Sequence, residues 1–169
     1  LTGSGSYDWR QSPGLLHLDV QGSNAAFDRA LFAALPGFLQ EVWTSLSPQG
    51  RFHVTTQLHW SPGQMPIVVV PKLDVLDGTV LLREFPYPFQ DVTGTFSYRD
   101  NQVDIATFTG SHDDTRVSGA GQANCHADGT VTIALSQLHA DDLTPSPALR
   151  RALPQALRDV VDALAPAGA

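Results

Sequence analysis

An internal repeat constrains this chain more than any other feature of its sequence. The 21-residue segments that begin at Ala30 and Ala148 align without a gap at an offset of 118 residues, and ten of the 21 positions are identical. The shared frame is A-L-x-x-A-L-P-x-x-L-x-x-V-x-x-x-L-x-P-x-G, so both prolines and the final glycine recur together with the leucines. A period of this kind predicts an array of similar units that bury their cores against their neighbours.

The similarity extends upstream of each copy in a looser form. A polar segment, a glycine-containing turn and an apolar segment precede the helical frame both at residues 4–20 and at residues 121–135. The chain begins with Leu1 rather than methionine, so we expect a natural N-terminal part, with any targeting segment, to be missing. The repeat predicts four parts: residues 1–22 as the terminal strands of a preceding unit, 23–50 as a helical pair, 51–140 as a β-meander, and 141–169 as the helical pair that opens the next unit.

Composition argues against a nucleic acid partner and against direct adhesion to anionic lipid headgroups. The chain has 10 lysines and arginines, with Lys72 as the single lysine, against 17 acidic residues, and its net charge is −7. Binding to phosphate needs clustered cations, which this chain cannot assemble. Cys125 stands alone, so neither an internal disulfide nor a thiolate metal cage is expected. We interpret it as a small buried or half-buried strand residue.

The central part of the chain has the two-residue periodicity of β-strands. In residues 51–60, Phe52, Val54, Leu58 and Trp60 share one face, while polar residues share the other. Pro71 predicts an edge or a bulge, since proline cannot donate to a sheet ladder. Turn residues predict hairpins at Asp77-Gly78 (between 72–76 and 79–83), Asp100-Asn101, Asp113-Asp114 and Asp128-Gly129. The predicted fold is α+β and mainly antiparallel: a curved β-meander of about six to eight strands, with a pair of short helices at each repeat boundary.

The repeated frame itself predicts the helical pair. Asn24 or Ser23 is expected to cap a first helix over Ala25–Ala34, and Pro36 to open a second one. The residue before a proline disfavours the α conformation, so the chain should break at Leu35 and, in the second copy, at Leu153. The two copies, Pro36–Leu46 and Pro154–Leu164, should superpose. Phe27, Phe38 and Trp43 lie on the apolar side of the helical region and are interpreted as core.

The chain contains no pattern typical of an enzyme. It has no Gly-x-Ser-x-Gly elbow and no phosphate-binding loop, and nothing pairs its two glutamates as acid and base. The best metal candidates are His112-Asp113-Asp114 and His139-Ala140-Asp141-Asp142, but both fall at predicted turns, where aspartate is common. His53 and His59 share one strand face about 20 Å apart, too far for one ion, and are interpreted as solvated strand residues. We therefore expect no catalytic residue, no metal site and no cofactor.

One stretch resembles a known family. Residues 86–105 read PYPFQDVTGTFSYRDNQVDI, and FTGS at 108–111 and VSGAG at 117–121 continue the pattern. This pattern resembles the AsmA-like superfamily, which includes TamB and related proteins anchored in the inner membrane. The resemblance implies repeated β-meanders that curl into a groove with an apolar interior, as in bridge-like lipid-transfer proteins. It also implies a periplasmic location, with an inner-membrane tether and other membrane contacts supplied by missing parts of the parent.

The alternating faces and the resemblance together lead to a functional hypothesis. We expect a non-catalytic repeat fragment of a larger bacterial envelope protein that binds or transfers lipid acyl chains along an apolar β-groove, with neighbouring repeats of the same parent as further partners. In a closed sandwich the same side chains would be core, and the fragment would be a structural or scaffolding module in outer-membrane assembly. A metal-dependent hydrolase is a distant third reading. The expected groove residues are Phe52, Val54, Leu58, Trp60, Val92, Phe96, Val131, Ile133 and Leu135.

Overall fold

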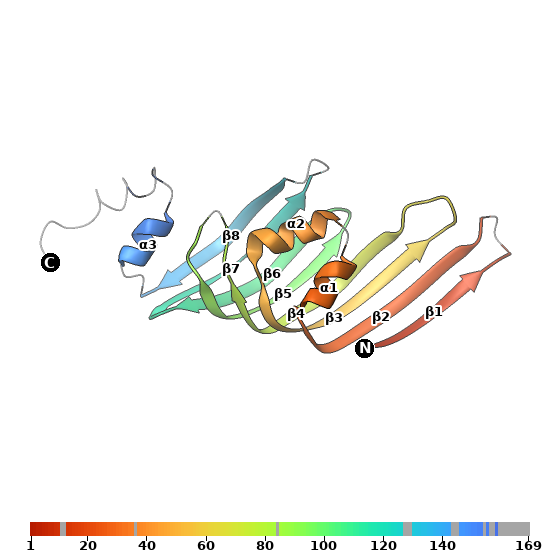
Figure 1. The fold of residues 1–169 in the computed structure, drawn as a ribbon, viewed down its shortest axis with the longest axis horizontal. Helices are drawn as coiled ribbons and strands as arrows, with labels where there is room; N and C mark the ends of the chain where they lie inside the picture. The colour runs from red at the N-terminus through yellow and green to blue at the C-terminus, as the bar shows by residue number, and fades with distance from the viewer. Residues whose placement is uncertain are drawn as a thin grey trace, which may run out of the picture.

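The chain folds into one open antiparallel sheet with short helices along one rim (Figure 1). The computed structural model describes residues 1–10, 13–35, 37–83, 85–126, 130–142 and 146–153, together with Gln155 and Arg158. Spatial order follows chain order across the eight strands, and each strand pairs antiparallel with the next. The prediction of a curved α+β meander is therefore confirmed. The strands are β1 Thr2–Asp8, β2 Leu15–Ala26, β3 Gln49–Trp60, β4 Ile67–Val80, β5 Phe89–Arg99, β6 Gln102–His112, β7 Thr115–Cys125 and β8 Val131–Asp141.

Three helices occur in the described part of the chain: α1 Arg29–Ala34, α2 Gly37–Leu46 and α3 Pro147–Ala152. The backbone is extended at Leu35 (φ −75°, ψ 146°) and at Leu153 (φ −66°, ψ 138°). The predicted breaks before both prolines are thus confirmed.

The start of the first helix was predicted four residues too early. Ala25 and Ala26 continue β2 and pair with Phe52 and Arg51, after a register shift that begins at Gly22. Asn24 adopts a left-handed backbone (φ 53°) inside this irregularity. The cap is Asp28, whose carboxylate accepts the N–H of Leu31 at 2.9 Å. Pairing with β3 therefore prevails over the cap signals at residues 23 and 24.

The predicted hairpin at Asp77-Gly78 was wrong. β4 runs straight through this dipeptide, because β3 pairs on one side of it (Gly50 opposite Gly78) and β5 on the other (Val92 opposite Gly78). A side chain at Gly78 would lie 3.1–3.3 Å from atoms of Val75, Gln49 and Val92, so glycine serves close packing here. The segment after β4 bonds to α2 instead, through Leu81 N–H to Leu46 O at 3.0 Å.

Two other predicted turns are confirmed. Asp100 and Asn101 have φ of 51° and 63°, the left-handed pair typical of a two-residue type I′ hairpin between β5 and β6. Asp113-Asp114 joins β6 to β7. Pro71 lies in β4 where the registers with β3 and β5 both shift, which is the predicted bulge. The turn predicted at Asp128-Gly129 lies outside the described residues.

The repeat recurs in the local structure at the offset read from the sequence. α1 and α3 span equivalent positions, and Ser146 caps α3 through the N–H of Leu149 at 3.1 Å, as Asp28 caps α1. Gln40 donates to Leu35 O at 3.0 Å, and its equivalent Arg158 donates to Leu153 O at 2.8 Å. Both helices follow the second strand of a hairpin. Apart from Gln155 and Arg158, the predicted superposition partner Pro154–Leu164 lies outside the described residues.

Candidate functional site

One face of the sheet is apolar across all strands from β2 to β8, and we call it the apolar face. Cross-strand partners point to the same side, and side chains alternate along each strand, so the register assigns every residue to a side. The nine residues expected to line a groove all fall on this one side. The apolar face comprises Leu16, Leu18, Val20, Phe52, Val54, Leu58, Trp60, Val68, Val70, Leu73, Val75, Val92, Phe96, Tyr98, Val103, Ile105, Phe108, Val117, Ala123, Val131, Ile133, Leu135 and Leu138.

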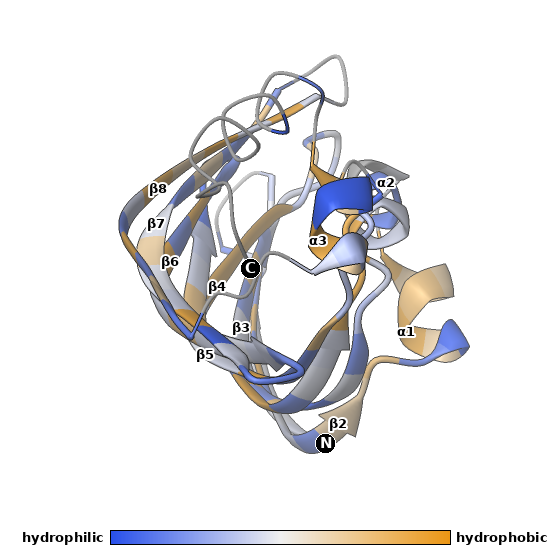
Figure 2. Cartoon of the chain, turned by 90° about the vertical axis from the view of Figure 1, so that its left-hand side faces the viewer, coloured by the Kyte–Doolittle hydropathy of each residue, from blue (hydrophilic) through white to orange (hydrophobic). Residues whose placement is uncertain are grey.

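The apolar face is concave. The sheet curls in cross-section, with α2 and α3 near its open side (Figure 2). Register shifts interrupt six of the seven strand pairs, and each such irregularity bends and twists its strand. The sheet stays open because, within the described residues, β1 and β8 each pair on one side only.

The apolar face is partly buried on β2 to β7 and exposed on β8. No large side chain of the described residues is fully buried, and on the apolar face only Phe52 and Ala123 fall in the buried class. On β8 the exposed fractions are 51% for Ile133, 46% for Leu135 and 59% for Leu138. A sealed sandwich would bury such residues almost completely. The described helices therefore do not fill the curve of the sheet.

Helical cover is confined to one rim. Phe27 contacts Phe52 and Trp43, with ring centroids 4.5 and 5.5 Å apart, and this cluster joins α2 to the start of β3. Phe27 and Trp43 thus pack between the helices and the sheet as interpreted, whereas the side chain of Phe38 lies outside the described residues. Further along the rim, Leu149 and Ala152 of α3 bury Tyr87 against a set of partly buried residues: Phe85, Phe89, Ala148 and Leu153.

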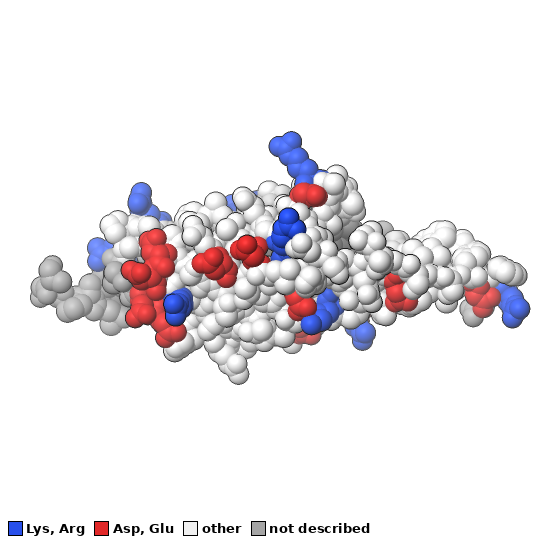
Figure 3. Space-filling view, turned by 90° about the horizontal axis from the view of Figure 1, so that it is seen from below, with Lys and Arg blue, Asp and Glu red and all other residues white. Residues whose placement is uncertain are grey.

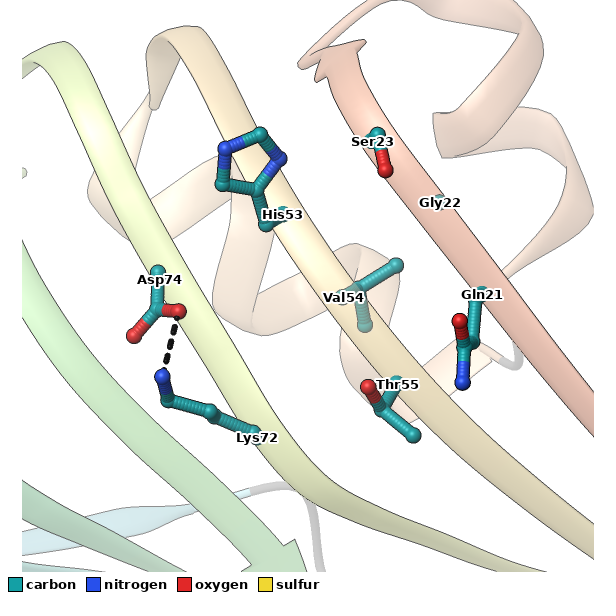
Figure 4. Close-up of a pocket in the computed structure, with 8 residues that line it drawn as sticks. All are labelled: Gln21, Gly22, Ser23, His53, Val54, Thr55, Lys72 and Asp74. Atoms are coloured by element: carbon teal, nitrogen blue, oxygen red, sulfur yellow. Dashed lines mark ion pairs between the residues drawn. The ribbon is translucent and has the colours of Figure 1, made fainter.

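The opposite side of the sheet is polar. A small hollow of about 100 Å³ crosses β2, β3 and β4 here, lined in part by Gln21, His53 and Asp74 (Figure 4). Lys72 Nζ lies 2.9 Å from Asp74 Oδ2, and Thr95 donates to Asp74 Oδ1 at 2.8 Å. These hydrogen bonds, led by that of Lys72, hold the pKa of Asp74 below its usual value. The hollow has room for water rather than for a substrate.

A larger polar pocket of about 530 Å³ lies between α1, α2 and the end of the 81–83 segment. Its lining includes Phe32, Glu41 and Arg83. Gln40 closes its base by donating to two carbonyls of α1 and its C-terminal cap, Phe32 O and Leu35 O. The pocket therefore belongs to the helix–helix junction, and the charged side chains among its described lining residues are Glu41 and Arg83.

The histidines of the polar face and of the strand ends make several different contacts. His139 contacts Asp141 at 3.1 Å on the exposed edge strand, and His112 stacks on Tyr87 with ring centroids 3.6 Å apart. His53 accepts the N–H of Asn24. His59, interpreted as a solvated strand residue, is partly exposed, and its ring contacts that of His17, 42 positions away in the sequence. Within the described part of the chain, no three His, Cys, Asp or Glu side chains converge in a metal-binding arrangement.

Cys125 is half-buried in β7, as interpreted, and burial raises the pKa of its thiol.

Acidic side chains gather toward the end of the molecule that carries β7, β8 and α3, and basic ones are dispersed (Figure 3). Among the described helices, none has the length and hydropathy to cross a membrane.

No family model, no curated protein and no solved structure matches the chain.

Proposed function

We propose that the chain is a non-catalytic part of a larger bacterial envelope protein and that its apolar face binds lipid acyl chains. The main support is the incomplete burial of that face, which is exposed on β8. A concave surface of aliphatic and aromatic side chains extends across the sheet, and its described residues carry no charge. Soluble proteins rarely leave apolar patches beyond a few hundred Å² open to water. Such a surface therefore calls for an apolar occupant.

The dimensions suit hydrocarbon. The apolar face runs over the seven strands β2 to β8, whose six spacings of about 4.8 Å make this concave trough roughly 29 Å long across the strands. The hydrocarbon core of a bilayer is about 30 Å thick, so one acyl chain needs roughly half of the trough. Each buried methylene contributes about 0.8 kcal/mol, so ten methylenes would keep a lipid bound through purification.

The charge distribution favours binding through the acyl chain rather than the headgroup. The net charge of −7, with 10 basic against 17 acidic residues, disfavours binding to anionic headgroups. The pattern at residues 86–121 resembles the AsmA-like superfamily, and the location consistent with that resemblance is the periplasm, with the inner-membrane tether in another part of the parent.

A scaffolding module is the second candidate, and it is favoured by the edge of β8, which pairs on one side only within the described residues. β2, the counterpart of β8 in the repeat, pairs on its far side with the strand that follows its own helical pair. An equivalent strand of a neighbouring unit would pair with β8 and cover Val131, Ile133 and Leu135. In that case the exposed apolar rows would be an interface between units, and not a lipid surface.

Binding of a fluorescent fatty acid to delipidated protein tests the proposal. Leu135→Glu places a carboxylate on the apolar face, and Ala134→Glu, the matched control, places it on the polar face of the same exposed strand. Phe96→Glu and Thr107→Glu form a second pair further inside the sheet. We expect the apolar-face variants to weaken binding at least tenfold and the controls to bind as wild type, while far-UV circular dichroism stays unchanged.

Native mass spectrometry of the freshly purified wild type supplies an independent readout, as co-purified lipid masses. Absence of both co-purified lipid and fatty-acid binding would refute lipid binding and favour the scaffold. Equal weakening by Ala134→Glu would show that charge in general, and not the apolar face, governs the signal.

A further inference from the structure

A pair of histidines on the polar face has the geometry of a metal chelate. His17 of β2 and His59 of β3 are directly opposite one another in the ladder. Their Nδ1 atoms are 3.0 Å apart and their ring centroids 4.4 Å apart. Two rings that pointed their nitrogens straight at each other would have centroids further apart than this, so both rings are bent away from the line that joins the nitrogens.

The other nitrogen of His17 is fixed by a carboxylate. His17 Nε2 lies 3.0 Å from Asp19 Oδ2, and Gln57 donates to Asp19 Oδ1 at 3.1 Å. A carboxylate accepts but does not donate, so His17 carries its proton on Nε2 and presents an unprotonated Nδ1 to His59. A histidine that ligates a metal through one nitrogen characteristically donates a hydrogen bond from its other ring N–H to a carboxylate. This hydrogen bond sets the tautomer and the orientation of the ring.

We propose that His17 and His59 bind a divalent transition cation of tetragonal preference, Cu²⁺ or Ni²⁺, through their two Nδ1 atoms. Metal–nitrogen bonds of about 2.0–2.1 Å to two nitrogens 3.0 Å apart enclose an angle of roughly 95°. This suits the right angles of square-planar and octahedral sites. A tetrahedral zinc site needs the nitrogens roughly 3.3–3.4 Å apart. Zn²⁺ should therefore bind more weakly than copper or nickel.

Binding of the cation needs little rearrangement of the His17 and His59 rings. In the metal-free pair, the Nδ1–H of His59 donates to Nδ1 of His17. On binding, the His59 proton moves to Nε2, both rings stay neutral, and water fills the remaining coordination positions. The pair is about one-third exposed on the side of His17, so water and the cation can reach it. The bound ion would clamp β2 to β3 on the face opposite the apolar one, so this site is independent of lipid binding.

The chain provides a matched control. His139 and Asp141 repeat the His-x-Asp arrangement of His17 and Asp19, with His139 Nε2 3.1 Å from Asp141 Oδ1. In the described structure, however, the residue opposite His139 is Ser118 and not a second histidine. His139→Ala therefore removes one exposed imidazole and its carboxylate contact but leaves the proposed chelate intact.

The test is a titration of tag-free, metal-free protein with Cu²⁺ and with Ni²⁺ against a competing chelator, together with electron paramagnetic resonance of the copper form. We expect one tight site per chain and a spectrum with two nitrogen ligands. His17→Ala and His59→Ala should each weaken binding at least tenfold and remove the two-nitrogen signature, whereas His139→Ala should change neither.

Asp19→Asn separates positioning from ligation. It should weaken binding about tenfold and keep the two-nitrogen signature, because Asp19 only orients His17. His59→Gln keeps a polar side chain of similar size and should abolish the chelate if His59→Ala fails to fold. Binding that survives both alanine variants, or that falls equally in His139→Ala, would overturn the proposal and indicate adventitious binding to surface imidazoles.

Discussion

The cost of truncating two phenylalanines on the same face distinguishes an open trough from a sealed core. Phe52 is 5% exposed and packs against Phe27, whereas Phe96 lies on the same face and is only half-buried. Replacing a fully buried phenylalanine by alanine typically costs about 3–5 kcal/mol of unfolding free energy. Phe52→Ala should fall in this range, because the helices cannot collapse into the space without losing their aromatic contacts to the sheet.

Phe96→Ala should cost much less. A partly exposed ring forfeits less transfer free energy than a fully buried one, and its loss leaves a space that is open to solvent, so we expect about 2 kcal/mol. The two variants remove the same atoms, so the difference of at least 1 kcal/mol between them reports the environment alone. Urea unfolding followed by far-UV circular dichroism measures both, with the dependence on denaturant checked for constancy.

The helical cover can be tested in the same assay. A double-mutant cycle between Phe27→Ala and Phe52→Ala should give a coupling of about 0.5–1.5 kcal/mol, as expected for an aromatic pair in contact. Equal losses for Phe52→Ala and Phe96→Ala would refute the reasoning, because they would mean that the apolar face is enclosed at both positions.

Three further outcomes follow from local contacts. Asp28→Ala and Ser146→Ala should each lower the unfolding free energy by about 1 kcal/mol in urea titrations, because each removes the same cap in one copy of the repeat. The pKa of Asp74 is lowered in the folded state, so its contribution to stability is present above the usual carboxyl pKa of about 3.9 and is lost as the pH falls through the lower folded value. Asp74→Asn should therefore flatten the acid limb of a stability-versus-pH curve below about pH 4. Burial raises the pKa of Cys125, so iodoacetamide should alkylate the native thiol more slowly at neutral pH than the thiol in urea.

Local patterns predicted the strands and one kind of turn well. Alternation along β3, β5 and β8 grouped the nine expected groove residues correctly within each strand, because a period of two needs no knowledge of distant partners. Asp100-Asn101 turned as expected, since both residues tolerate the left-handed backbone. Asp77-Gly78 did not, although its local signal was the stronger one. Pairing on both sides of β4 keeps that dipeptide extended, and this pairing depends on residues 49–51 and 92.

The histidine pair lay beyond the reach of the sequence for a related reason. His17 and His59 meet only because β2 and β3 pair in one register, across the intervening helical pair. Spacing along a single strand suggested only that His53 and His59 were too far apart to share an ion. A register that places Leu16 opposite Trp60 also places the two imidazoles opposite each other, so the signal was the joint alternation of two strands whose pairing had first to be known.

Glycines on the apolar face explain how its aromatic rings can lie close to the sheet. Glycines recur on the apolar face next to phenylalanines: a methyl group added at Gly94 would lie 2.8 Å from the ring of Phe96, and one at Gly119 would lie 2.9 Å from the ring of Phe108. The rings therefore lie down over glycine instead of standing up from the sheet, an arrangement that also supports curvature. Rings lying flat present their faces to the interior of the curve and fill little of it. The same small residues that let the sheet bend thus keep its concave side apolar and only partly filled by the described side chains.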